Sequence, residues 1–269
     1  MAQRRAREPA APTAPEPSRF PRWLIVLGLM AVLAFAFATL PATVLAGRIA
    51  RYGVHATMLS GSIWNGRAQG LTLRSIPVGN LRWQLRPLAL LGGRVAGTLD
   101  LDRTDGKVHT GFSASLGGAL RFDGLSASLP IEALAALPLG LPRGWRGRLA
   151  GQFETVEVEG YWPTVLRGTL DLDGLLAPPP RGVAIGSYHL EVPDPQAAAA
   201  EGRLHARVTD KDGPVSFQGR LTLGRDRSFL LEGTLAPRGS SPPELARSLA
   251  LLGPADAGGR RPVSVSGTF

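Results

Sequence analysis

Apolar and polar side chains alternate with a period of two residues over much of this chain, and this pattern constrains its fold more than any other feature. Residues 81–86 read Leu-Arg-Trp-Gln-Leu-Arg, so every second side chain is apolar. Similar alternation is found at 95–101, 166–172, 204–208, 219–223 and 263–269. Successive side chains of a strand point to opposite faces of a sheet, so each segment predicts a half-buried strand. A strand with one solvated face is typical of antiparallel sheets.

The composition and the spacing of these segments favour one curled antiparallel sheet. The chain contains 34 Gly and 23 Pro but only 6% aromatic residues, which indicates many short segments joined by tight turns. Residues 97–102 and 168–173 share the sequence Gly-Thr-Leu-Asp-Leu-Asp, which suggests repeated hairpin chemistry without a fixed period. We expect an all-β domain whose single sheet has about ten to twelve strands and a half-barrel-like shape.

Two short helices are expected to interrupt the strands. The segment from Pro130 to Leu137 starts with proline and stops before another proline. Residues Ser241-Pro-Pro-Glu244 form a capping box with proline at the first helical position, and Gly253-Pro254 would end that helix.

An uncharged apolar run precedes the β-rich part of the chain. The 18 residues from Trp23 to Leu40 carry no charge, and at about 1.5 Å per residue they nearly cross a hydrocarbon layer of about 30 Å. Pro41 to Ala46 are expected to supply the missing turn. The sequence therefore predicts one N-terminal transmembrane helix, with the anchor occupying residues 23–46.

The arginines around this run predict its orientation. Five arginines precede Trp23, whereas Arg48 and Arg51 follow shortly after the run. We expect residues 1–22, rich in Ala, Pro and Arg, to be a disordered cytoplasmic tail, and residues 47–269 to be an exported domain. The alternative is a cleaved signal peptide, because Val44-Leu45-Ala46 resembles a small-residue cleavage site.

The charge and the absence of cysteine exclude several classes of protein. The net charge of +9 comes almost entirely from arginine, since Lys107 and Lys211 are the only lysines. These arginines are scattered singly along the expected strands, which indicates solvated faces rather than a nucleic-acid groove. Without cysteine the chain forms no disulfide and offers no thiolate metal ligand. We expect no nucleic-acid partner.

No recognisable catalytic or cofactor-binding motif is present. The four histidines at positions 55, 109, 189 and 205 are too far apart in sequence to act as paired metal ligands on one element. The chain lacks the Gly-x-Ser-x-Gly nucleophile motif, and neither lysine is followed by Ser or Thr as a phosphate-binding loop requires. The acidic clusters at 100–105 and 171–173 are typical of strands that run into turns. We therefore expect no enzymatic activity, no cofactor and no metal.

One stretch of glycines and tryptophans is distinctive. Residues 61–68 read Gly-Ser-Ile-Trp-Asn-Gly-Arg-Ala, and residues 81–94 read Leu-Arg-Trp-Gln-Leu-Arg-Pro-Leu-Ala-Leu-Leu-Gly-Gly-Arg. With the apolar helix before them and the later segments 227–235 and 249–253, these residues resemble protein N of the bacterial type II secretion system. The matching motif residues are Gly61, Trp64, Gly66, Trp83, Pro87, Leu91 and Gly93. The resemblance implies an inner-membrane protein whose periplasmic part belongs to the export apparatus for folded exoproteins.

The tryptophans have two expected roles. Trp64 and Trp83 are expected to fill the apolar face of the sheet, because large rings suit a half-buried strand. Trp145 and Trp162 lie next to Gly144 and Pro163 in expected connections, where a partly exposed ring can contact a partner protein.

Two functions are consistent with these features. The first is an accessory inner-membrane component of the type II secretion system, which contacts other secretion-system subunits in the periplasm. The alternative is a membrane-anchored β-groove protein that binds or shuttles lipid in envelope maintenance. An outer-membrane barrel, suggested by the terminal Phe269, is disfavoured because the uncharged run would hold the chain in the inner membrane.

Overall fold

The computed structural model describes residues 22–73, 76–135, 144–160, 162–178, 182–193, 202–239, 241, 247, 249 and 253–268. The chain forms two compact units, residues 1–40 and residues 41–269.

The described part of the first unit is an apolar helix. Helix α1 runs from Arg22 to Ala38, with no charged residue after Arg22. Beyond it, the Thr39 hydroxyl donates to the Phe35 carbonyl at 2.8 Å. The residues expected to supply the missing turn, Pro41 to Ala46, do not continue α1 directly, because a separate helix begins at Thr43, after the proline. No helix within the described ranges is both long enough and apolar enough to cross a membrane.

Three short helices have described bounds in the second unit. They are α2 (Thr43–Ala50), the 3-10 helix η1 (Pro87–Gly92) and α3 (Ile131–Ala135). Helix α3 lies within the helix predicted from Pro130 to Leu137, whose last two residues fall outside the described ones. The helix predicted from Ser241 also lies mostly outside them, although Arg247 and Leu249 are helical and Leu249 is buried.

The strands of the second unit form one antiparallel sheet, as the alternation predicts. The first seven are β1 (Val54–His55), β2 (Met58–Gly61), β3 (Asn65–Leu73), β4 (Ile76–Leu85), β5 (Arg94–Asp102), β6 (Lys107–Ser115) and β7 (Ala119–Pro130). The other seven are β8 (Arg146–Glu159), β9 (Trp162–Leu176), β10 (Ala184–Glu191), β11 (Arg203–Asp212), β12 (Val215–Gly224), β13 (Ser228–Pro237) and β14 (Arg261–Thr268).

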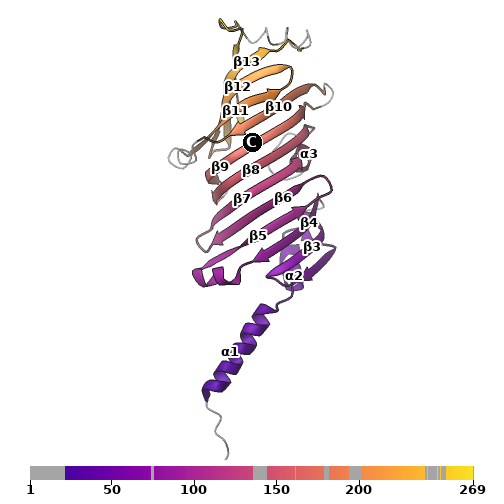
Figure 1. Ribbon diagram of the computed structural model, residues 1–269, viewed down its shortest axis with the longest axis vertical. Helices are drawn as coiled ribbons and strands as arrows, with labels where there is room; N and C mark the ends of the chain where they lie inside the picture. Colours follow the sequence, from indigo (N-terminus) through magenta and orange to yellow (C-terminus); the bar gives the residue numbers. More distant parts are fainter. Residues whose placement is uncertain are drawn as a thin grey trace, which may run out of the picture. The chain divides into compact units, whose positions relative to one another are not determined.

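From β3 onward the sheet is a meander in which each strand pairs with the next one in the chain. Figure 1 shows this order as a gradual change of colour from strand to strand. The short strands β1 and β2 both pair with β3, and the described sheet is open because they do not pair with β14. The 14 strands found in the described part of the chain exceed the expected ten to twelve. Strands β1 and β2, of two and four residues, are too short to show an alternating pattern.

The core of this sheet is thin. Ala42, Ala68 and Trp83 form one buried cluster, with exposed fractions of 0%, 2% and 8%. A second cluster near the other end of the sheet contains Leu204 and Ala206. No large side chain among the described residues is completely buried. This burial is what one layer of strands provides without a second sheet packed against it.

Aromatic rings lie directly over glycines on the apolar face. A Cβ atom on Gly66 would lie 2.2 Å from Cζ2 of Trp83, so the ring occupies the space of the missing side chain. The indole Nε1 of Trp83 donates to the Ile63 carbonyl at 2.9 Å, which fixes the ring in place. Equivalent contacts join Phe153 to Gly151 and Gly168, Phe217 to Gly219 and Gly233, and Phe229 to Gly267. The rings therefore fill space that a second layer would otherwise occupy.

Replacing Gly66 with Ala should destabilise the domain, because the added methyl group would overlap the Trp83 ring. Overpacking of this kind typically costs about 1–3 kcal/mol of unfolding free energy. The measurement is denaturant unfolding of the purified full-length chain. The matched control is Gly117→Ala in the β6–β7 turn, where the nearest atom to an added Cβ is Ser115 Oγ at 3.8 Å. Equal losses in the two variants would contradict the ring-over-glycine packing.

Candidate functional site

An uninterrupted row of apolar residues and glycines crosses the sheet. Each member is the register partner of the next, from β3 to β14. The row is Ala68, Leu81, Leu101, Val108, Ala127, Gly151, Leu170, Leu190, Val208, Gly219, Gly233 and Val263. Several members, such as Leu170 and Leu190, stay partly exposed. A continuous, half-exposed apolar face of this length is typical of a binding surface.

The opposite face carries a parallel row of polar residues, one position away along each strand. Its members are Arg67, Arg82, Asp100, His109, Ser126, Gln152, Thr169, Glu191, Arg207, Arg220, Glu232 and Ser264. Opposite charges on neighbouring strands contact each other, as in the pair Arg207–Glu191 at 3.5 Å. The sheet is therefore amphipathic along its whole described length.

The two identical hexapeptides place equivalent groups on this polar face. Residues 97–102 lie in β5 and residues 168–173 lie in β9. In the first copy, Asp100 Oδ1 lies 2.5 Å from Nδ1 of His109 on the next strand. In the second copy, Asp171 Oδ1 lies 2.9 Å from Nδ1 of His189, again on the next strand. The repeat thus produces two matching His–Asp pairs.

Each copy also has one of the two lysines of the chain as a neighbour on a nearby strand. Lys107 is the register partner of Asp102. Lys211 donates to Asp173 Oδ1 at 3.0 Å and lies 3.2 Å from Asp171 Oδ1. The sequence pattern did not reveal these contacts, although the identical hexapeptides were the signal that could have located them.

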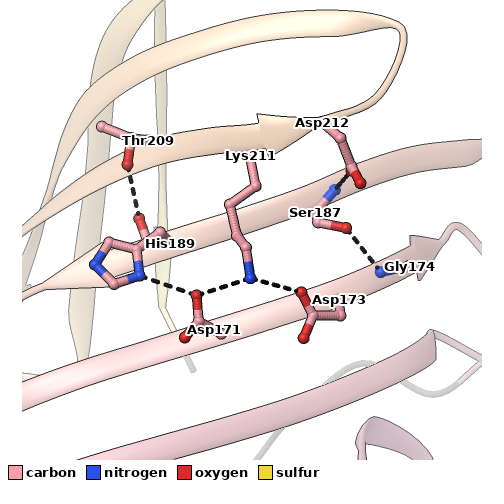
Figure 2. Close-up of polar contacts among 8 residues, drawn as sticks. All are labelled: Asp171, Asp173, Gly174, Ser187, His189, Thr209, Lys211 and Asp212. Carbon is pink, nitrogen blue, oxygen red and sulfur yellow. Dashed lines mark hydrogen bonds and ion pairs between the residues drawn. The ribbon is translucent and has the colours of Figure 1, made fainter.

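Figure 2 shows the second copy, which joins three consecutive strands. Asp171 and Asp173 extend from β9, His189 from β10 and Lys211 from β11. The hydrogen bond from His189 is the largest cause that lowers the pKa of the Asp171 carboxyl, and Lys211 lowers it further. Hydrogen bonds to Asp173 and then Asp171 raise the pKa of Lys211. Both shifts favour the charged forms, so this cluster is an ion-pair network.

Ser187 of β10 forms hydrogen bonds next to this cluster. Ser187 is buried, and its Oγ accepts a hydrogen bond from Gly174 N at 3.1 Å. Its own N–H donates to Asp212 Oδ1 at 2.9 Å (Figure 2). The hydrogen bonds drawn around this cluster do not join Ser187 to His189, so they contain no nucleophile–base pair. Within the described residues, no group of three or more His, Asp or Glu side chains is arranged to hold a metal ion.

A buried carboxylate lies on β11, two residues from Val208 of the apolar row. The Asp210 side chain is only 4% exposed and forms an ion pair with Arg238. Asp210 Oδ1 also accepts a hydrogen bond from Phe217 N at 2.7 Å. Burial raises the pKa of the neighbouring Tyr188 hydroxyl, and the Asp210 charge raises it further. Sequence reasoning missed this pair because Asp210 and Arg238 lie far apart along the chain.

The structure brings the first part of the family motif together. Gly61, with φ of +87°, ends β2, and a Cβ there would lie 2.4 Å from Asn65 O. Trp64 is half-buried, and its carbonyl accepts a hydrogen bond from Leu85 N at 2.6 Å. Gly66 lies beneath the Trp83 ring, as described above. These residues therefore connect β2, β3 and β4.

The second part of the motif builds η1. Pro87 begins this 3-10 helix, where its missing N–H costs no hydrogen bond. Gly93 ends it in the left-handed conformation, with φ of +67°. Leu91 lies between them and is 87% exposed.

The remaining candidate residues are not brought together. Trp145 precedes β8 and Trp162 begins β9, so they lie at opposite ends of one hairpin. Trp162 packs against the cluster of Leu204 and Ala206, and its buried Nε1 has no hydrogen-bond partner. Of the two residues predicted to bound the anchor, Trp23 is 63% exposed in α1, and Leu40 follows that helix.

These features define an open, amphipathic, single-sheet β protein. Residues 52–264 match the family described as type II secretion system (T2SS), protein N, and the chain belongs to this family. It is 27% identical over 252 residues to the type II secretion system protein N of Aeromonas hydrophila, covering 91% of this chain and 97% of the relative. It is 23% identical over 218 residues to the protein of the same name from Vibrio cholerae serotype O1, covering 80% and 85%. No solved structure matches the chain.

Replacing Asp171 with Asn should change how stability depends on pH. The folded-state pKa of Asp171 lies below its ordinary value of 3.8, so the charged carboxylate stabilises the fold. This contribution is complete above the ordinary value and is lost as the pH falls through the lowered one. We expect D171N to be less stable than wild type at pH 7, by less than about 1 kcal/mol because the group is partly solvated. The difference should shrink below pH 3.8.

The measurement is denaturant unfolding at a series of pH values. A matched control is Glu154→Gln, because Glu154 is an exposed carboxylate whose contact with Arg167 is longer, at 3.8 Å. This control should lose less stability than D171N at pH 7, because its contact is longer and more exposed. A D171N difference that stays constant down to pH 2 would contradict the ion-pair network.

Proposed function

We propose that this chain is an accessory inner-membrane component of the type II secretion system, which acts by protein contacts in the export of folded exoproteins across the outer membrane. The observation that carries this proposal is the family match over residues 52–264, which includes nearly the whole sheet. The Aeromonas relative, named as a protein of this system, is similar over 97% of its own length. The likeness therefore concerns the whole architecture rather than one module.

The proposed organisation has three parts. Residues 1–22 form a cytoplasmic tail, residues 23–46 contain the anchor, and residues 47–269 form the periplasmic β-rich domain. The uncharged run in α1 and the excess of arginine before it support this topology. Tethering would raise the effective concentration of the domain near membrane-bound subunits.

A role by contact rather than catalysis has structural support. Several charged groups on the hydrophilic face form ion pairs across strands, as in the cluster of Asp171, His189 and Lys211. Among the described strands, β14 pairs with β13 alone, so its outer edge can accept a strand from another protein. The rings of Trp145 and Trp162 are further proposed contact residues.

Lipid binding is the second candidate function, and one observation favours it. The apolar row crosses the sheet without a charged residue from Ala68 to Val263. Register shifts between β9 and β10 would bend the strands, which suits a curled, half-barrel-like sheet. Such a face could shield acyl chains during envelope maintenance.

The topology can be tested with an enzyme reporter that is active only after export. We expect activity when the reporter follows Gly70 and none when it precedes Trp23, because the arginine bias keeps the tail inside. Sequencing the mature N-terminus checks the signal-peptide alternative. A mature chain starting at Gly47 would refute the retained anchor.

Deleting the protein should lower secretion of folded exoproteins and leave them in the periplasm. Secreted and periplasmic fractions would be compared by immunoblot in the deletion strain and after complementation. The wild-type chain should restore secretion. A matched variant, in which a cleavable signal peptide replaces residues 1–46, should restore it poorly because the exported domain is no longer tethered.

The same strains distinguish the two candidate functions. Lipid binding predicts detergent sensitivity of the envelope even in cells that export no exoprotein. Normal secretion together with such an envelope defect would replace the secretion role with the lipid role.

A further inference from the structure

Three leucines at one end of the sheet are almost completely exposed. Leu88 and Leu91 belong to η1, and Leu116 lies in the turn between β6 and β7. Their exposed fractions are 78%, 87% and 91%. Leu116 N donates to Gly93 O at 3.3 Å, so the turn lies beside the end of η1. We call Leu88, Leu91 and Leu116 the leucine tip.

Packing within the domain does not account for the leucine tip. The sequence of η1 is Pro-Leu-Ala-Leu-Leu-Gly, yet none of its residues is buried. Exposed leucines gain nothing from the hydrophobic effect in the isolated domain, and a cluster of them marks a surface that something else covers.

Two arginines flank the leucine tip without a matching acidic group. Arg86 precedes η1 and Arg94 follows it, both are exposed, and neither forms an ion pair within the described residues. No acidic residue occurs between positions 85 and 99. Farther along the sheet, Asp123 on β7 and Glu157 on β8 both already contact Arg121, at 2.8 Å and 2.9 Å. The charge around the tip is therefore complementary to an anionic partner.

The leucine tip lies at the end of the sheet where the chain enters the second unit. Pro41 forms an isolated bridge with Ser62, which precedes Trp64 in the β2–β3 connection. Leu85, just before η1, donates its N–H to the Trp64 carbonyl at 2.6 Å. Pro41, which follows the apolar run of residues 23–40, and the segment leading into η1 thus contact the same connection. A membrane that holds residues 23–40 would lie within reach of this end by chain connectivity alone.

We propose that the leucine tip inserts shallowly into an anionic phospholipid surface, with Arg86 and Arg94 contacting lipid phosphates. Aliphatic side chains beside arginines suit the interface between acyl chains and headgroups. A protein partner is less well matched, because energetically dominant contact residues in protein interfaces are enriched in Trp, Tyr and Arg, whereas leucine is under-represented. The proposal rests on the proposed anchoring, and it adds a second membrane contact that would fix the domain's orientation.

The test measures the depth of single labelled cysteines in the full-length chain reconstituted into vesicles. The natural chain has no cysteine, so each introduced one is unique. Leu91→Cys and Leu116→Cys, each carrying an environment-sensitive fluorophore, report on the tip. Thr104→Cys, in the exposed turn at the opposite end of β5, is the matched control. The vesicles contain phosphatidylglycerol and phosphatidylcholine, with a quencher attached to lipid near the headgroup.

We expect quenching at positions 91 and 116 and none at position 104. Neutralising both arginines, in a variant carrying Arg86→Gln and Arg94→Gln, should remove the quenching, as should vesicles of phosphatidylcholine alone. Equal quenching at positions 91, 116 and 104 would overturn the proposal. Quenching that persists without anionic lipid or without both arginines would overturn the assigned role of charge.

A label at Phe35→Cys in α1, read with a quencher deep in the bilayer, separates failure of the tip from failure of the anchor. A quenched anchor label with unquenched tip labels would overturn the tip proposal alone. The reverse result would retain the tip and overturn the anchor.

Discussion

A sheet of a single layer has no opposing layer to cover its apolar face, and this constraint governs how the domain is packed. The structure meets it with rings that lie over glycines, as Trp83 does over Gly66. A flat ring covers backbone as well as side-chain area, so each such contact excludes water without a second sheet. The glycines beneath these rings are therefore part of the core, and the space above them is already filled. Phe217 covers Gly219 and Gly233 in the same way.

The polar face depends on the same continuous register. Because the side-chain period of a strand is two, a slip of one residue would exchange the apolar and polar rows. Cross-strand pairs such as Asp100–His109 and Asp171–His189 oppose this slip, since a shifted strand would lose its partner. The identical hexapeptides thus form the same kind of Asp–His pair at two places in the sheet. Lys211 on β11 also contacts Asp171 and Asp173 on β9, so it connects these two strands across β10.

The sequence predicted the parts of this fold that depend on local patterns. Alternation at 81–86 corresponds to β4, and the proline-bounded segment contains α3. The short strand β1 and helix α2 were missed because too few residues carry a pattern, and the break between α1 and α2 around Pro41 was not predicted. The contacts of Lys211 with Asp171 could not be predicted, since they require knowledge of which strands are neighbours. The exposure of Leu91 was equally hidden, because an apolar residue in a short helix is usually buried.

The meander also has a consequence for how the domain is assembled. Each strand after β3 pairs with the strand that precedes it in the chain, so contacts form between segments close in sequence. Low contact order favours rapid folding, and here it permits growth of the sheet from its N-terminal end while the rest of the chain is still being made. At every stage the newest strand leaves one unpaired edge, which is a site of aggregation until the next strand arrives. In the finished domain that edge is β14, so the last strand to join is the one that retains the capacity to pair.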